Sequence, residues 1–357
     1  MPHLIAEHVC KTQRHTTHYL AAGAADAPLI VFVHGWPELA ISWRAQLECF
    51  AALGFRVVAP DMRGYGRSTV YPRHSDYAME EIVQDMLELL AHLGRESAIW
   101  VGHDWGSPVV WSLASHQAHK CLAVANLCVP YMPNGFAPAN LIPLVDRGIY
   151  PEEAFPAGQW DYQLYYEEHF EDARRMLEAD TTRTVKALMR SGQPEGEGKP
   201  YRTASIRREG GWFGGATAVP DVPRDAGVLS EEALRQYASA LAANGFFGPD
   251  AWYMNAERNI AYAARAPSGG RLAMPVLFLH AAYDWICETY ASKLADPMRA
   301  TCDDLSEVIV DSGHWMQQER PERVNAALAG WIVRRLGSVW PDKGRVSRNP
   351  LEHGVKT

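Results

Sequence analysis

Three observations predict an α/β fold with a mostly parallel central sheet, flanked by helices and interrupted by a helical insertion. Apolar strand-like runs and amphipathic helical runs alternate from about residue 16 to residue 127. Helical patterns alone dominate from about residue 161 to residue 264, and the alternation returns from residue 275 to residue 335. Alternating strands and helices favour parallel pairing, because each helix crosses over one face of the sheet.

Length and charge set the domain organisation and exclude several classes of protein. The chain has 357 residues, which suggests two domains or one large domain with an insertion. We assign residues 1–130 and 271–340 to the sheet-bearing core, residues 131–270 to a helical cap domain and residues 341–357 to a C-terminal tail. A net charge of −8 provides no basic surface for nucleic acid or anionic membranes, and no apolar run is long enough to span a bilayer.

Cysteine and histidine usage indicates a cytoplasmic protein without a metal. The six cysteines are scattered and form no C-x-x-C pair, and the N-terminus has no secretory signal pattern. Neither His15/His18 nor His116/His119 has a third ligand nearby in the sequence. We therefore expect a reducing compartment, no disulfides, no metal and no cofactor. The oligomeric state stays open, with a homodimer as one option.

The first part of the core follows the alternation closely. The clearest helix has apolar residues at helical spacing from residue 82 to residue 93, and Gly94 ends it. Another helix is predicted at 43–53, closed by Gly54. Apolar runs predict strands near residues 16–20, 28–33, 55–59, 98–101 and 122–127.

The remaining elements divide between the cap and the end of the core. Pro and Gly interrupt residues 130–160, and Gly, Pro and charged residues predict a long loop at 192–225. Ser230, followed by two glutamates, is typical of a helix N-cap. The patterns predict strands at 275–280 and 307–310, helices at 161–178, 181–191, 231–243, 250–264 and 321–335, and a loose tail at 337–357.

The stretch around Asp104 organises the core. An apolar strand is followed by Gly102-His103-Asp104-Trp105-Gly106 and a second apolar run, which predicts a strand, a sharp turn and a helix. Such a turn holds its central residue in an unfavourable backbone conformation, and a side chain at either glycine would collide across it. This is the form of a nucleophile elbow, with Asp104 where serine hydrolases have serine.

Two further residues complete a catalytic arrangement. In hydrolases with such an elbow, a nucleophile, an acid and a histidine follow successive strands in that order. Asp104, Asp284 and His314 occur in this order, and each follows a predicted strand. Taken singly, Asp284 fits a turn residue and His314 an interior histidine. All three together on the correct strands favour a catalytic set.

An aspartate at the elbow determines the type of reaction. Its attack on a saturated carbon forms an ester, whereas serine would form an ether that water does not readily cleave. Water activated by His314 can hydrolyse that ester at the Asp104 carbonyl, while Asp284 orients and stabilises the imidazole. The oxyanion of this step needs donors, and the backbone N–H groups of Trp36 and Trp105 are suitably placed in such a fold.

Four motifs point to one family: His-Gly-Trp-Pro-Glu at 34–38, Asp-Met-Arg-Gly-Tyr-Gly-Arg-Ser at 61–68, Gly-His-Asp-Trp-Gly at 102–106 and Gly-His-Trp at 313–315. In these motifs the chain resembles the epoxide hydrolases of the α/β-hydrolase fold, over about residues 25–335. The resemblance implies that a small apolar epoxide and water react to give a vicinal diol, through an alkyl ester on the aspartate.

The resemblance also implies site residues beyond the elbow. Two cap tyrosines hold the epoxide oxygen in that family, and their motifs match Tyr162 and Tyr253 here, with Tyr165 and Tyr166 as rivals. A phenol with an ordinary pKa of about 10 stays protonated at neutral pH and can donate to an alkoxide.

Two implications concern the loop at 34–38. The family suggests a cis peptide bond before Pro37. It also suggests a supporting role for Glu38 near the water, although a glutamate that follows a strand is more often on the surface.

Two other functions stay open at this point. A haloalkane or haloacid dehalogenase would use the same aspartate and His–Asp pair, with the indole N–H of Trp105 on the halide; the two tyrosine motifs favour the epoxide. A non-catalytic ligand-binding protein of this fold is the other alternative, and the intact catalytic set argues against it. In either case we expect a largely apolar pocket between cap and sheet, with these candidates for its lining: Trp160, Trp212, Phe213, Phe246 and Phe247.

Overall fold

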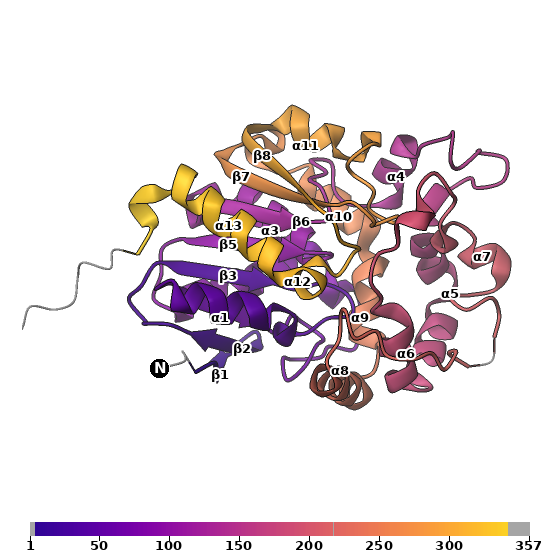
Figure 1. Cartoon of the computed structure of the whole chain (residues 1–357), viewed down its shortest axis with the longest axis horizontal. Helices are drawn as coiled ribbons and strands as arrows, with labels where there is room; N and C mark the ends of the chain where they lie inside the picture. Colours follow the sequence, from indigo (N-terminus) through magenta and orange to yellow (C-terminus); the bar gives the residue numbers. More distant parts are fainter. Residues whose placement is uncertain (1–3, 217, 342–357) are drawn as a thin grey trace, which may run out of the picture.

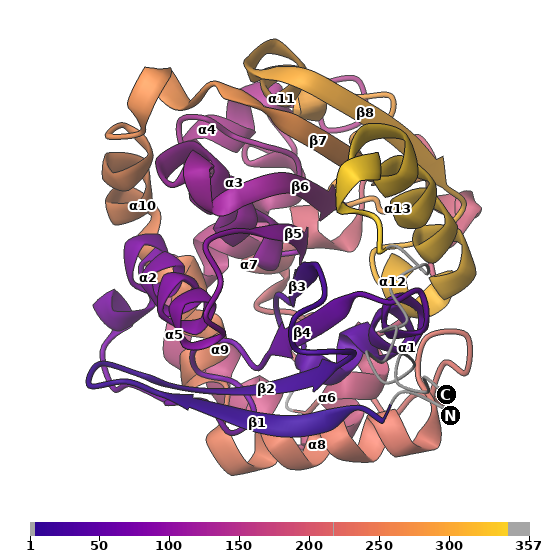
Figure 2. The same ribbon diagram turned by 90° about the vertical axis from the view of Figure 1, so that its left-hand side faces the viewer.

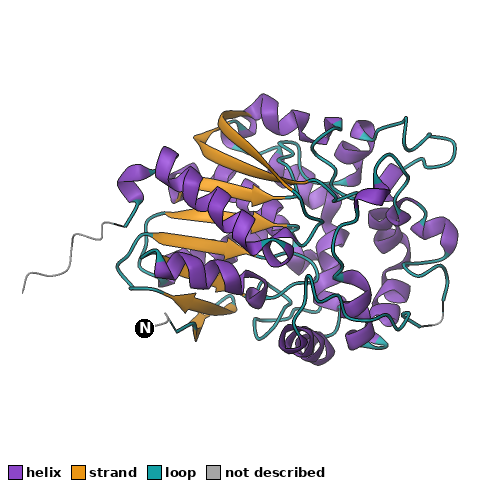
Figure 3. Cartoon of the chain, in the orientation of Figure 1, coloured by secondary structure: helices purple, strands orange, loops and turns teal. Residues whose placement is uncertain are grey.

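The protein is built on an eight-stranded, mostly parallel sheet (Figures 1 and 3). The computed structural model describes residues 4–216 and 218–341. The strand order is β1-β2-β4-β3-β5-β6-β7-β8; the pairs β1–β2 and β2–β4 are antiparallel and the other pairs are parallel. The predicted fold class is therefore confirmed. The strands are β1 (Ala6–Lys11), β2 (Thr16–Ala22), β3 (Leu29–Val33), β4 (Arg56–Pro60), β5 (Ala98–His103), β6 (Cys121–Leu127), β7 (Leu272–Ala281) and β8 (Cys302–Val310).

All seven strands predicted from apolar runs form, and β1 is an eighth strand that the sequence pattern does not reveal. It lies at the edge of the sheet and pairs only with β2, so most of its side chains are exposed or half-buried. Such a strand has no continuous apolar run. By contrast, β3 and β5 are buried along their whole length, because helices cover both faces of the sheet there.

Helices cover the two faces of the sheet in pairs (Figure 2). α2 and α3 lie on one face, and α1 and α13 lie on the other. The predicted helices at 43–53, 82–93 and 321–335 correspond to α1, α2 and α13. The helices of this part are α1 (Arg44–Ala52), α2 (Met79–His92), α3 (Gly106–His116), α11 (Asp296–Thr301), α12 (Met316–Glu319) and α13 (Pro321–Arg335).

Between β6 and β7 the chain forms a helical insertion, which lies beyond the carboxyl ends of the parallel strands (Figures 1 and 3). The predicted helices at 161–178, 181–191 and 231–243 correspond to α5, α6 and α8. The boundaries at 130/131 and 270/271 that divide core from cap stay a prediction. The helices of the insertion are α4 (Pro138–Leu141), α5 (Asp161–Glu178), α6 (Thr181–Leu188), α7 (Ile206–Glu209), α8 (Glu231–Asn244), α9 (Phe247–Ala251) and α10 (Ala256–Ala263).

The prediction of a single helix at 250–264 is wrong, because the chain forms three shorter elements there. A 3₁₀ turn, η8 (Trp252–Asn255), separates α9 from α10. The side-chain amide of Asn255 donates to the carbonyl of Ala251 at 2.9 Å. That carbonyl is the one which a continuous helix would offer to the backbone N–H of Asn255, so the side chain competes with the helix at this point.

The loop predicted at 192–225 and the tail predicted at 337–357 are both more ordered than expected. The loop contains α7 and two short 3₁₀ turns, η6 (Pro194–Gly196) and η7 (Arg202–Ala204). In the tail, Trp340 packs edge-to-face on Phe55, with ring centroids 5.3 Å apart. The rest of the tail, residues 342–357, lies outside the described residues. None of the helices in the described ranges combines the length and apolar character needed to cross a membrane.

Ser230 caps α8 as predicted, since its Oγ accepts a hydrogen bond from the backbone N–H of Ala233 at 3.0 Å. We expect Ser230→Ala to lower the free energy of unfolding by about 1 kcal/mol, because this N–H would lose its partner. Ser230→Asp retains an acceptor and should leave stability unchanged. Thermal unfolding of the three proteins measures the effect; equal midpoints for Ser230→Ala and the parent would contradict it.

Candidate active site

Asp104 lies at the tip of a sharp turn between β5 and α3. Its φ of 48° is positive, a conformation that residues other than glycine rarely adopt. The neighbouring glycines make the turn possible. A Cβ on Gly102 would lie 2.5 Å from the Asn126 side chain, and a Cβ on Gly106 would overlap the carbonyl of Val33. The chain therefore forms an elbow that presents Asp104 to the cavity described below.

The three residues predicted as a catalytic set lie together at the ends of three strands. Asp284 follows β7 and His314 follows β8. Nδ1 of His314 is 2.6 Å from Oδ2 of Asp284, and Nε2 is 3.3 Å from Oδ2 of Asp104. The imidazole is thus held between two carboxylates.

Asp284 is itself fixed by its own loop. Its Oδ1 accepts hydrogen bonds from the backbone N–H groups of Ile286 and Cys287, both at 3.1 Å. These donors stabilise the ionised carboxylate, because each adds a partial positive charge beside it.

The charges of this set reinforce one another. Burial by itself lowers the pKa of His314, but the charge of Asp284 and the hydrogen bonds that the imidazole donates to Asp104 and Asp284 raise it well above its ordinary value. Burial opposes ionisation of Asp284, yet the charge and hydrogen bond of His314 bring its pKa below the ordinary value. The surroundings therefore favour the charged forms of both groups, the imidazolium of His314 and the carboxylate of Asp284.

The other oxygen of Asp104 is held by the loop after β3. The backbone N–H of Trp36 donates to Oδ1 of Asp104 at 2.5 Å. The peptide bond between Trp36 and Pro37 is cis, as the resemblance implies. Gly35 permits this close approach, because a Cβ there would overlap both Oδ1 of Asp104 and the backbone nitrogen of Trp105. The backbone N–H groups of Trp36 and Trp105, both expected to stabilise the oxyanion, thus lie beside Oδ1 of Asp104. Of the two, Trp36 donates a hydrogen bond to this oxygen.

Glu38 is fully buried beneath the predicted catalytic set and does not follow the general tendency of such glutamates to lie on the surface. Its Oε2 accepts from the backbone N–H of Gly35 at 2.9 Å and from Nδ1 of His103 at 2.8 Å. Its Oε1 accepts from Nε2 of Gln317 at 2.6 Å. Nε2 of His103 in turn donates to the backbone carbonyl of His314 at 2.7 Å. Glu38 is therefore connected to His314 through His103.

Sequence reasoning did not identify His103 or Gln317 as part of the site. His103 directly precedes Asp104 within the elbow motif, and this position is the sequence feature that could have identified it as part of the site. Gln317 is three residues beyond His314 in α12 and carries no comparable signal. Burial opposes the charged form of His103, but the charge of Glu38 and its hydrogen bonds raise the pKa of this imidazole to about 10.

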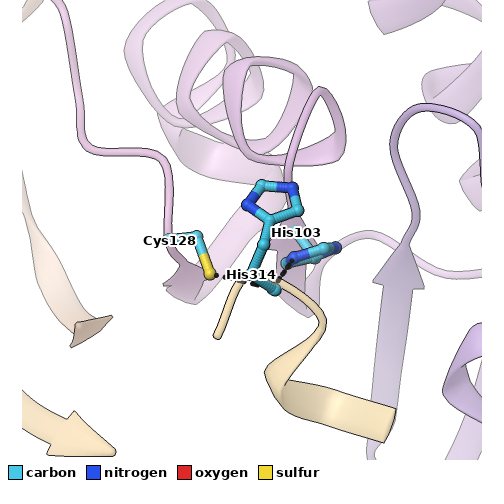
Figure 4. Close-up of side chains that lie close together, drawn as sticks. All are labelled: His103, Cys128 and His314. Carbon is cyan, nitrogen blue, oxygen red and sulfur yellow. Dashed lines mark hydrogen bonds between the residues drawn. The ribbon is translucent and has the colours of Figure 1, made fainter. Parts of the chain in front are cut away.

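His103, Cys128 and His314 bring three possible metal-binding atoms close together (Figure 4). The sequence reasoning did not anticipate this cluster. All three side chains already have hydrogen-bond partners. The two ring nitrogens of His103 contact Glu38 and the backbone carbonyl of His314. The Sγ of Cys128 donates to the same carbonyl at 3.2 Å, and Nδ1 of His314 donates to Asp284. A metal would have to break these contacts, so the donor set fits a hydrogen-bonded network better than a metal centre.

A cavity of about 310 Å³ opens beside Asp104, between the sheet and the helical insertion. Tyr162 from α5 and Tyr253 from η8 both line it, and their ring centroids are 5.7 Å apart. Burial raises the pKa of both phenols well above the ordinary value, so both stay protonated at neutral pH. The rest of the lining is rich in aromatic side chains, including Trp36, Trp105, Phe136, Trp212, Trp285 and Trp315.

Several expectations about the cavity lining are wrong. Of the five aromatic candidates, Trp212 lines the cavity and the other four do not. Trp160 and Phe246 are fully buried behind the lining, against Phe136 and Trp36 respectively. The remaining two, Phe213 and Phe247, are half-buried and pack against the hydrophobic core.

The two rival tyrosines also lie outside the cavity. Tyr166, one helical turn beyond Tyr162, stacks on the far side of Tyr253 with ring centroids 4.5 Å apart. Tyr165 borders a separate surface hollow beside Trp212 and Phe213. Helical spacing alone does not reveal which of these rings faces the cavity, because that depends on how α5 packs.

The chain matches one fold family, and the names of its relatives agree with one another. Residues 28–321 match the family described as the alpha/beta hydrolase fold. The chain is 34% identical over 322 residues to "Epoxide hydrolase A" of Mycobacterium tuberculosis (strain ATCC 25618 / H37Rv), covering 87% of this chain and 92% of that protein. It is 32% identical over 318 residues to "Bifunctional epoxide hydrolase 2" of Sus scrofa, covering 88% of this chain and 53% of the relative, so it spans about half the length of that protein.

The fold is also similar to solved structures. The crystal structure of Epoxide Hydrolase A from Mycobacterium thermoresistibile superimposes with a TM-score of 0.75 at 30% identity, covering 92% of this chain and 98% of the other. The similarity thus extends over the sheet and the helical insertion alike.

The buried Glu38–His103 pair makes stability depend on pH. His103 keeps its proton in the folded protein up to a pKa of about 10 but loses it near pH 6.5 when unfolded. The folded state therefore binds one more proton between these values, and rising pH favours unfolding by up to about 1.4 kcal/mol per pH unit. The pKa of Glu38 is lowered, so its contribution is constant in this window.

We expect the stability of the parent protein to fall more steeply from pH 7 to pH 9.5 than that of Glu38→Gln/His103→Gln. The double variant replaces both titrating groups by neutral amides and retains His314, whose effect is then common to both proteins. Denaturant unfolding at several pH values measures the difference. Parallel stability curves would show that His103 is not charged in the folded protein.

Proposed function

Because the chain belongs to the epoxide hydrolases of the α/β-hydrolase fold, we propose that it converts an epoxide to a vicinal diol in two steps through an alkyl ester on Asp104. The observation that carries this proposal is the position of the Asp104 carboxylate. One oxygen is held by the N–H of Trp36 and the other faces His314 and the cavity. A carboxylate held in this way can attack carbon and then lose its product to water.

In the first step, Oδ2 of Asp104 attacks an epoxide carbon. The new carbon–oxygen bond forms as the ring carbon–oxygen bond breaks, and its electron pair moves to the former ring oxygen. Tyr162 and Tyr253 donate hydrogen bonds to this oxygen, and one of them supplies the proton. Their place in the cavity and their raised pKa values support this role. Oδ1 remains as the carbonyl oxygen of the ester, still beside Trp36.

In the second step, water attacks the ester carbonyl carbon and gives a proton to His314. The acyl carbon–oxygen bond then breaks, and the imidazolium returns this proton to the departing oxygen, so that the diol leaves. The remaining proton of the water passes to His314, which leaves Asp104 as a carboxylate. The proton that His314 held before the first step replaces the one that the tyrosine gave up.

Ester formation removes the negative charge of Asp104, which is one of the groups that raise the pKa of His314. The imidazole pKa therefore falls once the ester has formed, and the histidine becomes a base when the reaction needs one. Asp284 stabilises the imidazolium that forms. The N–H groups of Trp36 and Trp105 stabilise the negative charge that develops on Oδ1.

The network beneath the site supports the second step. Glu38 and His103 together hold the backbone carbonyl of His314, which limits movement of the imidazole. We therefore assign Glu38 a positioning role in the hydrolysis of the ester.

The cavity supports a small apolar epoxide as substrate. Its walls are rich in aromatic side chains, and Tyr162 and Tyr253 of the insertion present protonated hydroxyls among them. Acidic O–H donors suit an alkoxide, whereas the halide of a dehalogenase reaction calls for N–H donors. Trp105 lines the same cavity, so halogenated compounds are the informative controls. A cytoplasmic location and a homodimer stay predictions.

The ester intermediate is directly testable. His314→Gln keeps a side chain of similar reach but lacks a base, so ester hydrolysis should slow by roughly 10²–10⁴-fold. Exposure to styrene oxide should then add the mass of one substrate to a peptide containing Asp104. In the parent protein, one turnover in ¹⁸O water should label Asp104 before it labels the diol. An unmodified variant, together with immediate label in the diol, would exclude the ester.

The two tyrosines should control ring opening. Tyr162→Phe/Tyr253→Phe should lower the rate of ester formation by on the order of 10²–10⁴-fold, because no proton donor remains for the alkoxide. Tyr165→Phe is the matched control, because Tyr165 lies outside the cavity. This variant should turn over epoxide at the parent rate. Rapid-quench mass spectrometry measures ester formation. A fully active double variant, or halide release without diol formation by the parent, would overturn the assignment.

A further inference from the structure

Trp36 makes a second hydrogen bond, on the side opposite the nucleophile. While its backbone N–H donates to Asp104, its indole Nε1 donates to Oδ1 of Asp250 at 2.9 Å. Asp250 belongs to α9 of the helical insertion, 214 residues further along the chain. One tryptophan thus connects the catalytic aspartate to a carboxyl group of the insertion.

Asp250 is an unusual residue for its surroundings. It is completely buried and takes part in no ion pair among the residues that the structure describes. Its second oxygen, Oδ2, has no hydrogen-bond partner there. Burial raises the pKa of this carboxyl well above the ordinary value and the charge of Glu178 adds to the shift, while the hydrogen bond from Trp36 and the nearby hydroxyl of Tyr166 oppose it only in part. A polar group buried with one hydrogen bond lowers stability relative to an apolar side chain of similar size.

The other contacts of the Trp36 side chain do not fix its orientation. The indole stacks on Trp212 at a centroid distance of 5.7 Å and meets Tyr166, Phe246 and Tyr253 edge-on. Ring contacts of this kind are weakly directional, so they allow small rotations and shifts. The hydrogen bond to Asp250 is the directional contact of this ring.

We propose that Asp250 is a positioning residue, which holds the indole of Trp36 so that its backbone N–H stays directed at Oδ1 of Asp104. This inference rests on the proposed ester mechanism and adds a group from the insertion to it. Asp250 accepts its hydrogen bond from the indole, so it can act on the reacting atoms only through Trp36.

The two chemical steps should respond differently to this contact. During ester formation Oδ1 loses negative charge, so a weaker hydrogen bond from Trp36 does not slow the step. During hydrolysis Oδ1 becomes an oxyanion, and the same N–H must stabilise the full charge. Loss of the Asp250 contact should therefore slow hydrolysis selectively. When hydrolysis limits turnover, kcat and KM then fall together and kcat/KM changes little.

Three variants test the proposal, with styrene oxide as the probe. In Asp250→Leu, we expect kcat and KM to fall roughly tenfold and the ester to accumulate. The tenfold loss is smaller than the roughly 10²–10³-fold cost of losing such a donor outright, because the N–H of Trp36 is still present. Asp250→Asn retains an acceptor for the indole and should behave like the parent. Trp36→Phe keeps the ring and the backbone N–H but removes the indole donor, so it should resemble Asp250→Leu.

Further measurements separate positioning from general damage. The double variant Trp36→Phe/Asp250→Leu should be no slower than either single variant, because both remove the same contact. Asp250→Leu should unfold at the parent temperature or above it. If Asp250→Leu does not fold, Trp36→Phe alone decides the selective effect on hydrolysis.

Other results would overturn the proposal. Equal slowing of both steps, additive losses in the double variant, or an Asp250→Asn variant as slow as Asp250→Leu would assign Asp250 a purely structural role. If the parent forms no ester at all, the proposed mechanism fails as well. An ester in the parent with unchanged hydrolysis in the variants refutes the role of Asp250 alone.

Discussion

The hydrogen bond from the backbone N–H of Trp36 to Oδ1 of Asp104 is the contact on which the rest of the site depends. It holds one oxygen of the carboxylate and leaves the other facing His314 and the cavity. The contact requires β3 and β5 to be parallel neighbours, because their carboxyl ends then bring the two loops together. It also requires Gly35, since any side chain there would occupy the space between them.

Burial of charge is the second constraint on this part of the molecule. His314 lies between the carboxyl groups of Asp104 and Asp284, and Glu38 and His103 form a second hydrogen-bonded pair below them. Each acid is hydrogen-bonded to backbone N–H groups or to an imidazole, which offsets the cost of removing it from water. In the proposed mechanism, ester formation on Asp104 would remove one negative charge from beside His314, in the direction that the second step needs.

Most of the fold could be predicted because buried strands and amphipathic helices impose periodic apolar patterns on the sequence. The predicted strands and the helix at 161–178 follow from such patterns. The missed strand β1 and the broken helix at 250–264 show where periodicity is uninformative. An edge strand needs no apolar run, and one side-chain amide, that of Asn255, interrupts a helix without changing its hydrophobic pattern.

The sequence by itself determined the elbow and the order of Asp104, Asp284 and His314, because these depend on neighbouring residues and on the order of strands. The family resemblance, also carried by the sequence, singled out Tyr162 and Tyr253. Tertiary structure alone decided which rings face the cavity, that Glu38 is buried on His103, and that Asp250 meets Trp36. These contacts join residues that are 65 and 214 positions apart. Local sequence patterns describe only what lies within a few residues, whereas such pairs depend on how separate elements pack in space.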